Sequence, residues 1–277
     1  MVKKRSKHIV NSVIVLVLLL CFSCKESKKK TITINPPKKI VENQTTPEVV
    51  AEAETAQSEP DLFAILLPNS YRIVDNDDPT KELNTDWFDL FEKDGNFFIE
   101  KAKYTISKGY DECVGTETKS IDTKRKTLLL LDYKKLVVGK IDHLAIPNQY
   151  IWPTEKQEFV FNNQKYSLRA EGRIKSTERI PGEEGQKDQL WHNVEDYKLF
   201  IKTETAAEEL LLSEKGFNDT FVKLLFVGDL DKDGKLDFIF EANRDYEEDR
   251  VILFLSSEAK GNKVEEKVSE ISIQHDC

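Results

Sequence analysis

The sequence has no apolar run long enough to cross a membrane, and it has few residues of the kinds that usually carry catalysis. Its longest apolar run covers residues 13–22, whereas a membrane helix needs about 20 residues. It has four histidines. It contains neither an H-E-x-x-H pair nor a G-x-S-x-G elbow, so the zinc-peptidase and serine-hydrolase motifs are excluded.

The short apolar run follows Lys3, Lys4 and Arg5, and this order is typical of a signal peptide spanning residues 1–23. The run ends in Leu-Leu-Leu-Cys-Phe-Ser-Cys, which resembles a bacterial lipobox, with the small Ser23 before Cys24. The resemblance implies that Cys24 is acylated, for example with palmitate, and attaches the protein to a membrane. Cys21 is a rival acylation site, and an ordinary secreted protein cut nearby is the other alternative.

Lys25 follows the predicted lipidated cysteine, in place of the aspartate associated with retention in the inner membrane. We therefore expect a cell-envelope protein on the outer membrane, facing either the periplasm or the surface. Removal of residues 1–23 takes away four basic residues and leaves 37 against 50 acidic ones, a net charge of −13. A nucleic acid is excluded as a partner, since a polyanion is repelled by this charge.

Only two cysteines, Cys113 and Cys277, lie outside the signal peptide and the lipobox. In an oxidising compartment two such cysteines predict one disulfide bond. Free or intermolecular thiols are the alternative. A metal site is disfavoured because neither cysteine has a cysteine or histidine at ligand spacing.

Composition changes sharply near residue 60. Residues 24–60 are rich in Lys, Pro, Thr and Glu and contain no aromatic residue, so they predict a disordered tether. Residues 61–277 hold all three tryptophans and all eight tyrosines, and they are expected to form a calcium-binding β-domain.

Short apolar or alternating runs bounded by turn residues predict a mainly β domain, an antiparallel sandwich or curled sheet with little helix. The expected strands are 87–91, 97–106, 127–131, 158–161, 165–170, 197–202, 220–227, 236–240, 251–255 and 264–273. A helix over 85–93 is the alternative for the first of these, and 205–213 is the best helix candidate. Residues 173–193 are expected to form a long mobile loop, in which Trp191 either anchors a ligand or belongs to the core.

The most informative motif is Gly-Asp-Leu-Asp-Lys-Asp-Gly-Lys-Leu-Asp at residues 228–237. Oxygen ligands at alternate positions and a glycine at the sixth position are typical of a calcium loop. The predicted ligands are four side chains and one backbone carbonyl, namely Asp229, Asp231, Asp233 and Asp237, and the carbonyl of Lys235. The alternative is a charged turn without metal, which the repulsion among four carboxylates disfavours.

An EF-hand places a glutamate at the twelfth position, but here that residue is Phe240, within a strand-like run. The loop instead resembles the strand-borne calcium loop of FG-GAP and VCBS-type repeats. The resemblance covers about a dozen residues and implies Ca²⁺ ligation by these five residues. A complete propeller is not expected, since the motif occurs once.

These patterns predict a membrane-anchored envelope lipoprotein with a calcium-stabilised β-domain. We expect a binding or structural module with a protein or glycan partner rather than an enzyme. The alternative is an envelope polysaccharide hydrolase that uses carboxylates which the sequence does not identify.

Overall fold

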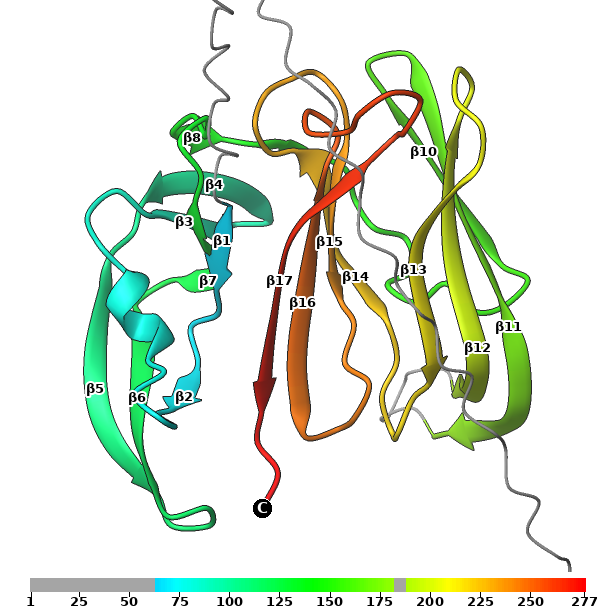
Figure 1. Ribbon diagram of the computed structural model, residues 1–277. Helices are drawn as coiled ribbons and strands as arrows, with labels where there is room; N and C mark the ends of the chain where they lie inside the picture. The colour runs from blue at the N-terminus through cyan, green and yellow to red at the C-terminus, as the bar shows by residue number, and fades with distance from the viewer. Residues whose placement is uncertain (1–62, 182–187) are drawn as a thin grey trace, which may run out of the picture. The chain divides into compact units, whose positions relative to one another are not determined.

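Three layers of antiparallel β-sheet make up the described part of the chain, with the sheet of β14–β17 in the middle (Figure 1). The structure is a computed structural model that describes residues 63–181 and 188–277. The predicted signal peptide, Cys24 and the tether up to residue 60 lie outside the described residues. No helix in the described ranges is long and apolar enough to cross a membrane.

The central sheet has the order β17-β16-β15-β14-β9. Its strands are β9 (Asp142–His143), β14 (Lys223–Asp229), β15 (Asp237–Glu241), β16 (Glu248–Leu255) and β17 (Glu266–Gln274). The sheet on one side has the order β10-β11-β12-β13, from β10 (Lys156–Phe161), β11 (Gln164–Ile180), β12 (Gln189–Thr203) and β13 (Glu209–Gly216).

A third sheet lies on the opposite side of the central sheet and has the order β1-β7-β3-β4-β8. Its strands are β1 (Ala64–Leu66), β3 (Phe88–Lys93), β4 (Asn96–Lys101), β7 (Lys126–Asp132) and β8 (Gly139–Lys140). Beside it, β2 (Ser70–Arg72), β5 (Tyr104–Asp111) and β6 (Thr116–Thr123) form a small sheet in the order β2-β6-β5. The only helix among the described residues is a 3-10 turn, Pro79–Glu82, so the predicted mainly β antiparallel architecture is confirmed.

The central sheet is apolar on both faces because each face covers a separate core. Successive side chains of a strand point to opposite faces. Phe238 and Phe240 of β15 pack into the core shared with β10–β13, whereas Ile239 between them packs into the core shared with β3, β4 and β7. The continuous apolar runs of β14–β16 follow from this burial on both sides.

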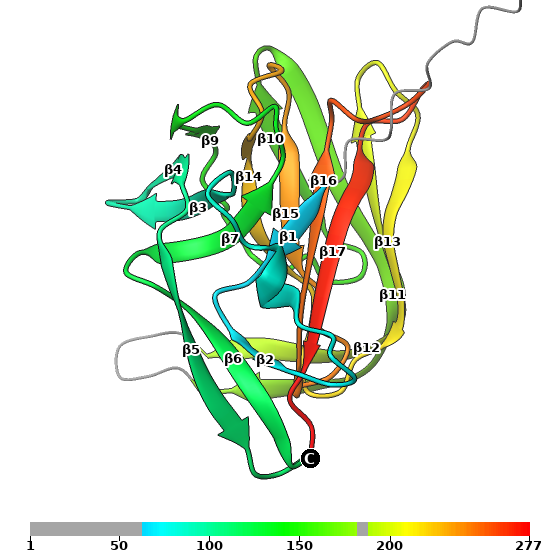
Figure 2. The same cartoon turned by 60° about the vertical axis from the view of Figure 1, so that its left-hand side comes forward.

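Two expectations from the sequence are wrong. The helix candidate at residues 205–213 is largely strand, since β13 begins at Glu209 and pairs with β12. The predicted loop at 173–193 is mostly a hairpin, because β11 continues to Ile180 and β12 begins at Gln189. This hairpin bends away from its sheet (Figure 2), and its register is irregular near residues 171–176. Bulges of this kind bend strands. The outer part of the hairpin has polar residues on both faces, so the sequence there does not show the alternation that predicts a strand.

The expected strand at 97–106 is also divided in two. β4 pairs with β3, while β5 pairs with β6 in the small sheet. The other expected strands each overlap an observed one, and 87–91 is strand β3 rather than a helix.

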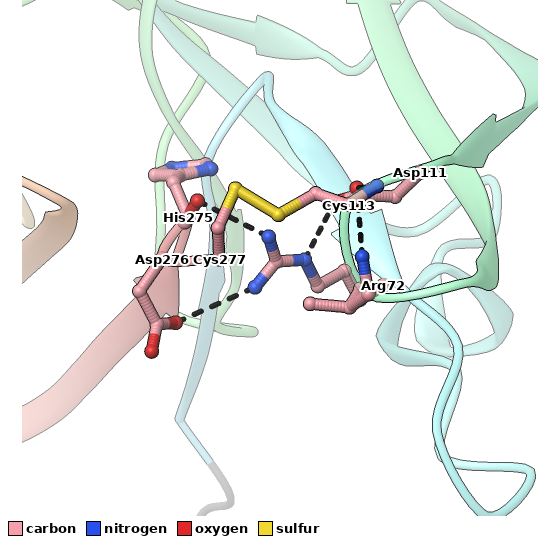
Figure 3. The surroundings of a disulfide bond; sticks show 7 residues. Arg72, Asp111, Cys113, His275, Asp276 and Cys277 are labelled. Carbon is pink, nitrogen blue, oxygen red and sulfur yellow. Dashed lines mark hydrogen bonds and ion pairs between the residues drawn. A yellow bond between two sulfur atoms is a disulfide. The ribbon is translucent and has the colours of Figure 1, made fainter.

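A disulfide bond joins Cys113, in the turn after β5, to Cys277, and the two Cα atoms are 5.4 Å apart. Arg72 lies beside this bond (Figure 3) and donates from Nε to Asp111 at 2.8 Å and from a terminal nitrogen to the carbonyl of His275 at 3.1 Å. The predicted pairing is therefore confirmed. The bond and Arg72 together tie the end of the chain to the β5–β6 hairpin.

Candidate metal site

The predicted calcium loop connects β14 to β15, and its first and last acids stand at the ends of these strands. β14 ends at Asp229 and β15 begins at Asp237, as the strand-like flanks of the motif predict. Gly234 has φ +87°, a conformation that glycine adopts without strain, so the chain can turn back sharply. The site therefore lies at one end of the central sheet.

Close packing against β9 fixes the incoming strand. Gly228 pairs with His143, and Asp229 pairs with Asp142. A Cβ atom on Gly228 would lie 2.7 Å from the carbonyl oxygen of Asp142, so only glycine fits. The glycine of the Gly-Asp step therefore lets β9 approach and hold the first acid in place.

Three of the four acids converge. Carboxylate oxygens of Asp229, Asp231 and Asp237 all lie within 4.8 Å of one another, so this group can hold a metal ion. Asp229 and Asp237 are buried, and Asp231 is partly buried. The donor atoms are all hard oxygens, which suit Ca²⁺, Mg²⁺ or Mn²⁺ rather than soft metals.

One oxygen in the group has no partner. Oδ1 of Asp229 is buried without a hydrogen bond to any described residue, while Oδ2 accepts a bond from the Gly234 amide at 3.0 Å. An unpaired buried carboxylate oxygen is costly, since it loses hydration and gains nothing in exchange. A cation among the three carboxylates would supply the missing partner.

Asp237 is the most deeply buried of the three, with an exposed fraction of 0%. Its two oxygens accept bonds from the amides of Ser256, at 2.9 Å, and Leu230, at 2.7 Å. Each carboxylate oxygen has two lone pairs, so these bonds orient Asp237 and still leave it able to bind an ion.

Asp233 lies outside the group of three. Its oxygens accept bonds from the Lys235 amide at 2.8 Å and the Ser256 hydroxyl at 2.9 Å. Lys235 places its ammonium 4.0 Å from Asp233. The structure thus brings three of the five predicted ligands together and places Asp233 in a neighbouring hydrogen-bond network.

Burial raises the pKa values of all three converging acids. For Asp229 the cause is burial, partly offset by the Gly234 amide, and for Asp231 it is burial, partly offset by the Ser257 hydroxyl. The pKa of Asp237 is raised well above its ordinary value by burial and then by the charge of Asp231. Without a cation the site therefore resists full ionisation.

A fourth buried acid stands near the loop. Glu265, just before β17, is 1% exposed, and neither carboxylate oxygen has a hydrogen-bond partner among the described residues. Its pKa is raised well above the ordinary value, first by burial and then by the charge of Asp237. Glu265 was not predictable from the sequence, because nothing in its local pattern separates it from the other acids of the chain.

Residues from two other connections and from strand β11 contact the loop. Asn162, in the β10–β11 turn, donates to the Gly234 carbonyl at 2.8 Å. Ser257, after β16, donates its hydroxyl to Asp231, and the Tyr166 hydroxyl accepts the Leu236 amide at 3.3 Å. These contacts were not predictable, since the residues lie 26 to 72 positions away in the sequence. The loop consequently joins the central sheet to its neighbour.

The comparisons with known proteins give no assignment. No protein-family model matches the chain, and no curated protein or solved structure is significantly similar to it.

Proposed function

We propose that this chain is an envelope lipoprotein whose β-domain is a binding module stabilised by one Ca²⁺ ion. The observation that carries the metal part is the buried, unpaired Oδ1 of Asp229 beside Asp231 and Asp237. The lipid part rests on the sequence around Cys24.

Calcium fits the donor set better than magnesium does. Ca²⁺ takes six to eight oxygen ligands in a flexible arrangement, whereas Mg²⁺ needs near-ideal octahedral geometry and keeps its waters. Asp229, Asp231 and Asp237 supply the first donors. The Lys235 carbonyl, Asp233 and water complete the shell in the arrangement implied by the FG-GAP-type loop.

A structural role for the ion follows from where its ligands lie. Asp237 is tied to Ser256, Asp231 to Ser257, and Gly234 to Asn162, so the loop organises two other connections. An ion bound by several carboxylates fixes the loop and removes their mutual repulsion, so it stabilises the arrangement in which these attachments form. The expected affinity is that of extracellular calcium modules, a Kd of about 10⁻⁴ to 10⁻³ M.

Calorimetric titration of the metal-free protein with CaCl₂ tests the metal site. We expect one site per chain in the wild type and at least a tenfold weaker site in Asp229→Asn, because the amide removes a formal charge from the group. Asp75→Asn is the matched control, since Asp75 is exposed and distant in sequence from the loop. Wild-type protein that takes up no calcium, or equal binding by Asp229→Asn, contradicts the proposal.

Metabolic labelling with palmitate tests the anchor. Cys24→Ser is expected to lose the label and to leave the membrane fraction, since the acylated sulfur is absent. Cys21→Ser is the matched control, and it should keep both the palmitate label and its place in the membrane fraction. Loss of label in Cys21→Ser alone assigns the lipid to Cys21 and contradicts the anchor proposed at Cys24.

A further inference from the structure

A groove at the surface of the β10–β13 side has the lining of a binding site. It lies between the connection from β9 to β10 and the beginning of β12, and its volume is about 500 Å³. A second hollow of about 360 Å³ shares four of its lining residues, Pro147, Asn148, Tyr150 and Glu155. Small-ligand sites typically have volumes of about 300 to 1,000 Å³.

Aromatic rings form part of the groove wall. Trp152 is stacked on Phe221 with ring centroids 4.2 Å apart, and Tyr150 is stacked on Trp152 at 5.5 Å. His192 meets Trp152 edge-on at 4.8 Å. Each ring is held by another, and Tyr150 and His192 remain partly exposed. Fixed aromatic faces of this kind pack well against flat apolar surfaces, including the C–H faces of sugar rings.

The polar side chains of the groove offer both donors and acceptors. The primary amides of Asn148, Gln149 and Gln189 each carry an oxygen acceptor and an NH₂ donor. Asn148 accepts the Tyr150 amide on its oxygen at 3.1 Å, so its NH₂ group stays available. Oε2 of Glu155 accepts the Trp152 amide at 3.0 Å, and Oε1 makes no hydrogen bond to another described residue. Sugar hydroxyls, which donate and accept, match this set.

Backbone hydrogen bonds preform the groove. The Gln149 carbonyl accepts the Leu224 amide of β14 at 2.8 Å, and the Ile151 carbonyl accepts the Tyr197 hydroxyl at 3.0 Å. The Glu155 amide donates to the Trp152 carbonyl at 2.9 Å. A lining fixed in this way loses little entropy when a ligand binds.

The charge of the lining selects the kind of ligand. Glu155 and Lys156 are the charged side chains across both hollows, and their charges cancel. Nothing there attracts a polyanion, and an amphipathic helix needs a more apolar groove. A proline-rich peptide also docks on aromatic grooves, but its prolines have no N–H group to donate to Glu155.

We propose that this groove binds a neutral oligosaccharide. The proposal rests on the proposed function as a binding module and names its ligand class. Hydroxyl groups bond to the three amides and to Glu155, and a sugar face packs on Tyr150. Trp152 lines the groove, and Trp191 contacts the rings of Tyr150 and Trp152. The fluorescence of two of the three tryptophans therefore reports on binding.

Tryptophan fluorescence titrations of the full chain in calcium test the proposal. The probes are the hexasaccharides of β-1,4-linked glucose, N-acetylglucosamine, xylose and mannose, with decaproline and polygalacturonate as rival ligands. We expect at least one hexasaccharide to shift the emission. We also expect Tyr150→Ala to weaken binding about tenfold or more, because burial of an aromatic ring is lost. Tyr150→Phe should retain most of the affinity.

Gln189→Ala is a second variant that leaves the fold intact, since this exposed side chain makes no hydrogen bond to a described residue, and a severalfold loss is expected. Tyr246→Ala is the matched control, because Tyr246 is 62% exposed and does not line the groove. Binding of decaproline or polygalacturonate alone, no binding of any probe, or binding unchanged in both groove variants overturns the proposal. Calcium binding is measured in a separate calorimetric titration. The groove can therefore be tested even if the protein binds no calcium.

Discussion

The two ends of the central sheet differ in whether their buried charged side chains have partners of opposite charge. At the end where β16 begins, Arg250 is 7% exposed and lies 2.5 Å from Glu214 of β13 and 2.5 Å from Glu270 of β17. At the end where β14 meets β15, Asp229, Asp237 and Glu265 are buried and form no ion pair with a described lysine or arginine. The acids at the first end are paired with arginine, whereas these three acids at the second end have no such partner.

The pKa values of the buried acids record this difference. Burial by itself raises the pKa of Glu248, yet the hydrogen bonds from Arg244 and Ser272 outweigh it and lower the pKa to about 2. Burial raises the pKa of Asp237, and no cationic side chain offsets it. These two carboxylates, both shielded from solvent at opposite ends of one sheet, thus differ in whether a cationic side chain lies beside them, and this difference supports the metal ion proposed for the second end.

The largest expected effect comes from breaking the end that has its own cations. Arg250→Ala leaves Glu214 and Glu270 without their shared partner and should lower the free energy of unfolding by about 3–5 kcal/mol. Chemical denaturation measures this. Lys263→Ala is the control, since its ion pair with Glu266 is exposed and should contribute about 0–1 kcal/mol. Equal losses of unfolding free energy in the two variants would contradict the claim that the buried Arg250 pairs matter more than the exposed Lys263 pair.

Acid should lower the free energy of unfolding through Glu248, at the end of the sheet that holds Arg250. The folded-state pKa of Glu248 is below its unfolded value, so its contribution is present above about pH 4.5 and is lost as the pH falls towards 2. The shift corresponds to about 3 kcal/mol. Denaturation of Glu248→Gln and wild type between pH 2 and 6 measures it. The two curves should converge at the lowest pH, and parallel curves contradict the assignment.

The end of the sheet that holds Asp229 and Asp237 should show the opposite dependence of stability on pH in metal-free protein. Asp229, Asp231 and Asp237 have raised folded-state pKa values, so the unfolded chain ionises first as the pH rises. Stability should therefore fall as the pH increases from about 4, by about 1.4 kcal/mol for each unit of raised pKa. Saturating calcium should remove this fall. Melting curves between pH 4 and 8, with EDTA or with CaCl₂, measure both effects, and a metal-free protein that gains stability over this range contradicts them.

A neutral substitution in the loop should have the smallest effect on the metal-free protein and a clear effect on its calcium response. Asp231→Asn keeps an acceptor for the Asp233 amide and a partner for Ser257, while it removes one charge. We expect a gain of about 0.5–1 kcal/mol without metal, since repulsion falls, and loss of most of the calcium response. Ser257→Ala, which retains all the carboxylates, should keep the calcium response.

Much of the fold was predictable where the sequence pattern has a single cause. The strands β7 and β14–β16 are apolar because they are buried, and the turns Asp94-Gly95 and Asn162-Asn163 mark two hairpins. The outer part of the β11–β12 hairpin, most of β5 and all of β6 were missed. In β5 and the outer part of β11 the residues are exposed on both faces, so they show no alternation of apolar and polar residues.

The sequence predicted the three acids that converge, together with Asp233 and Lys235, which lie outside that group. Asp229, Asp231 and Asp237 could be predicted because their spacing is typical of a calcium loop. Tertiary packing alone brings three other residues to the same end of the sheet, namely Asn162, Ser256 and Glu265. Their local sequence therefore does not predict that they lie beside the loop.

Thermal unfolding of the wild-type protein at pH 7, after verified metal removal and then with CaCl₂ raised to 10 mM, tests the central claim most directly. A Kd of about 10⁻⁴ to 10⁻³ M predicts stabilisation by about 1.4 to 2.7 kcal/mol. This corresponds to a rise in Tm of about 3 to 10 °C. An unchanged Tm across the titration would contradict the account, because the unpaired carboxylates would then need no ion.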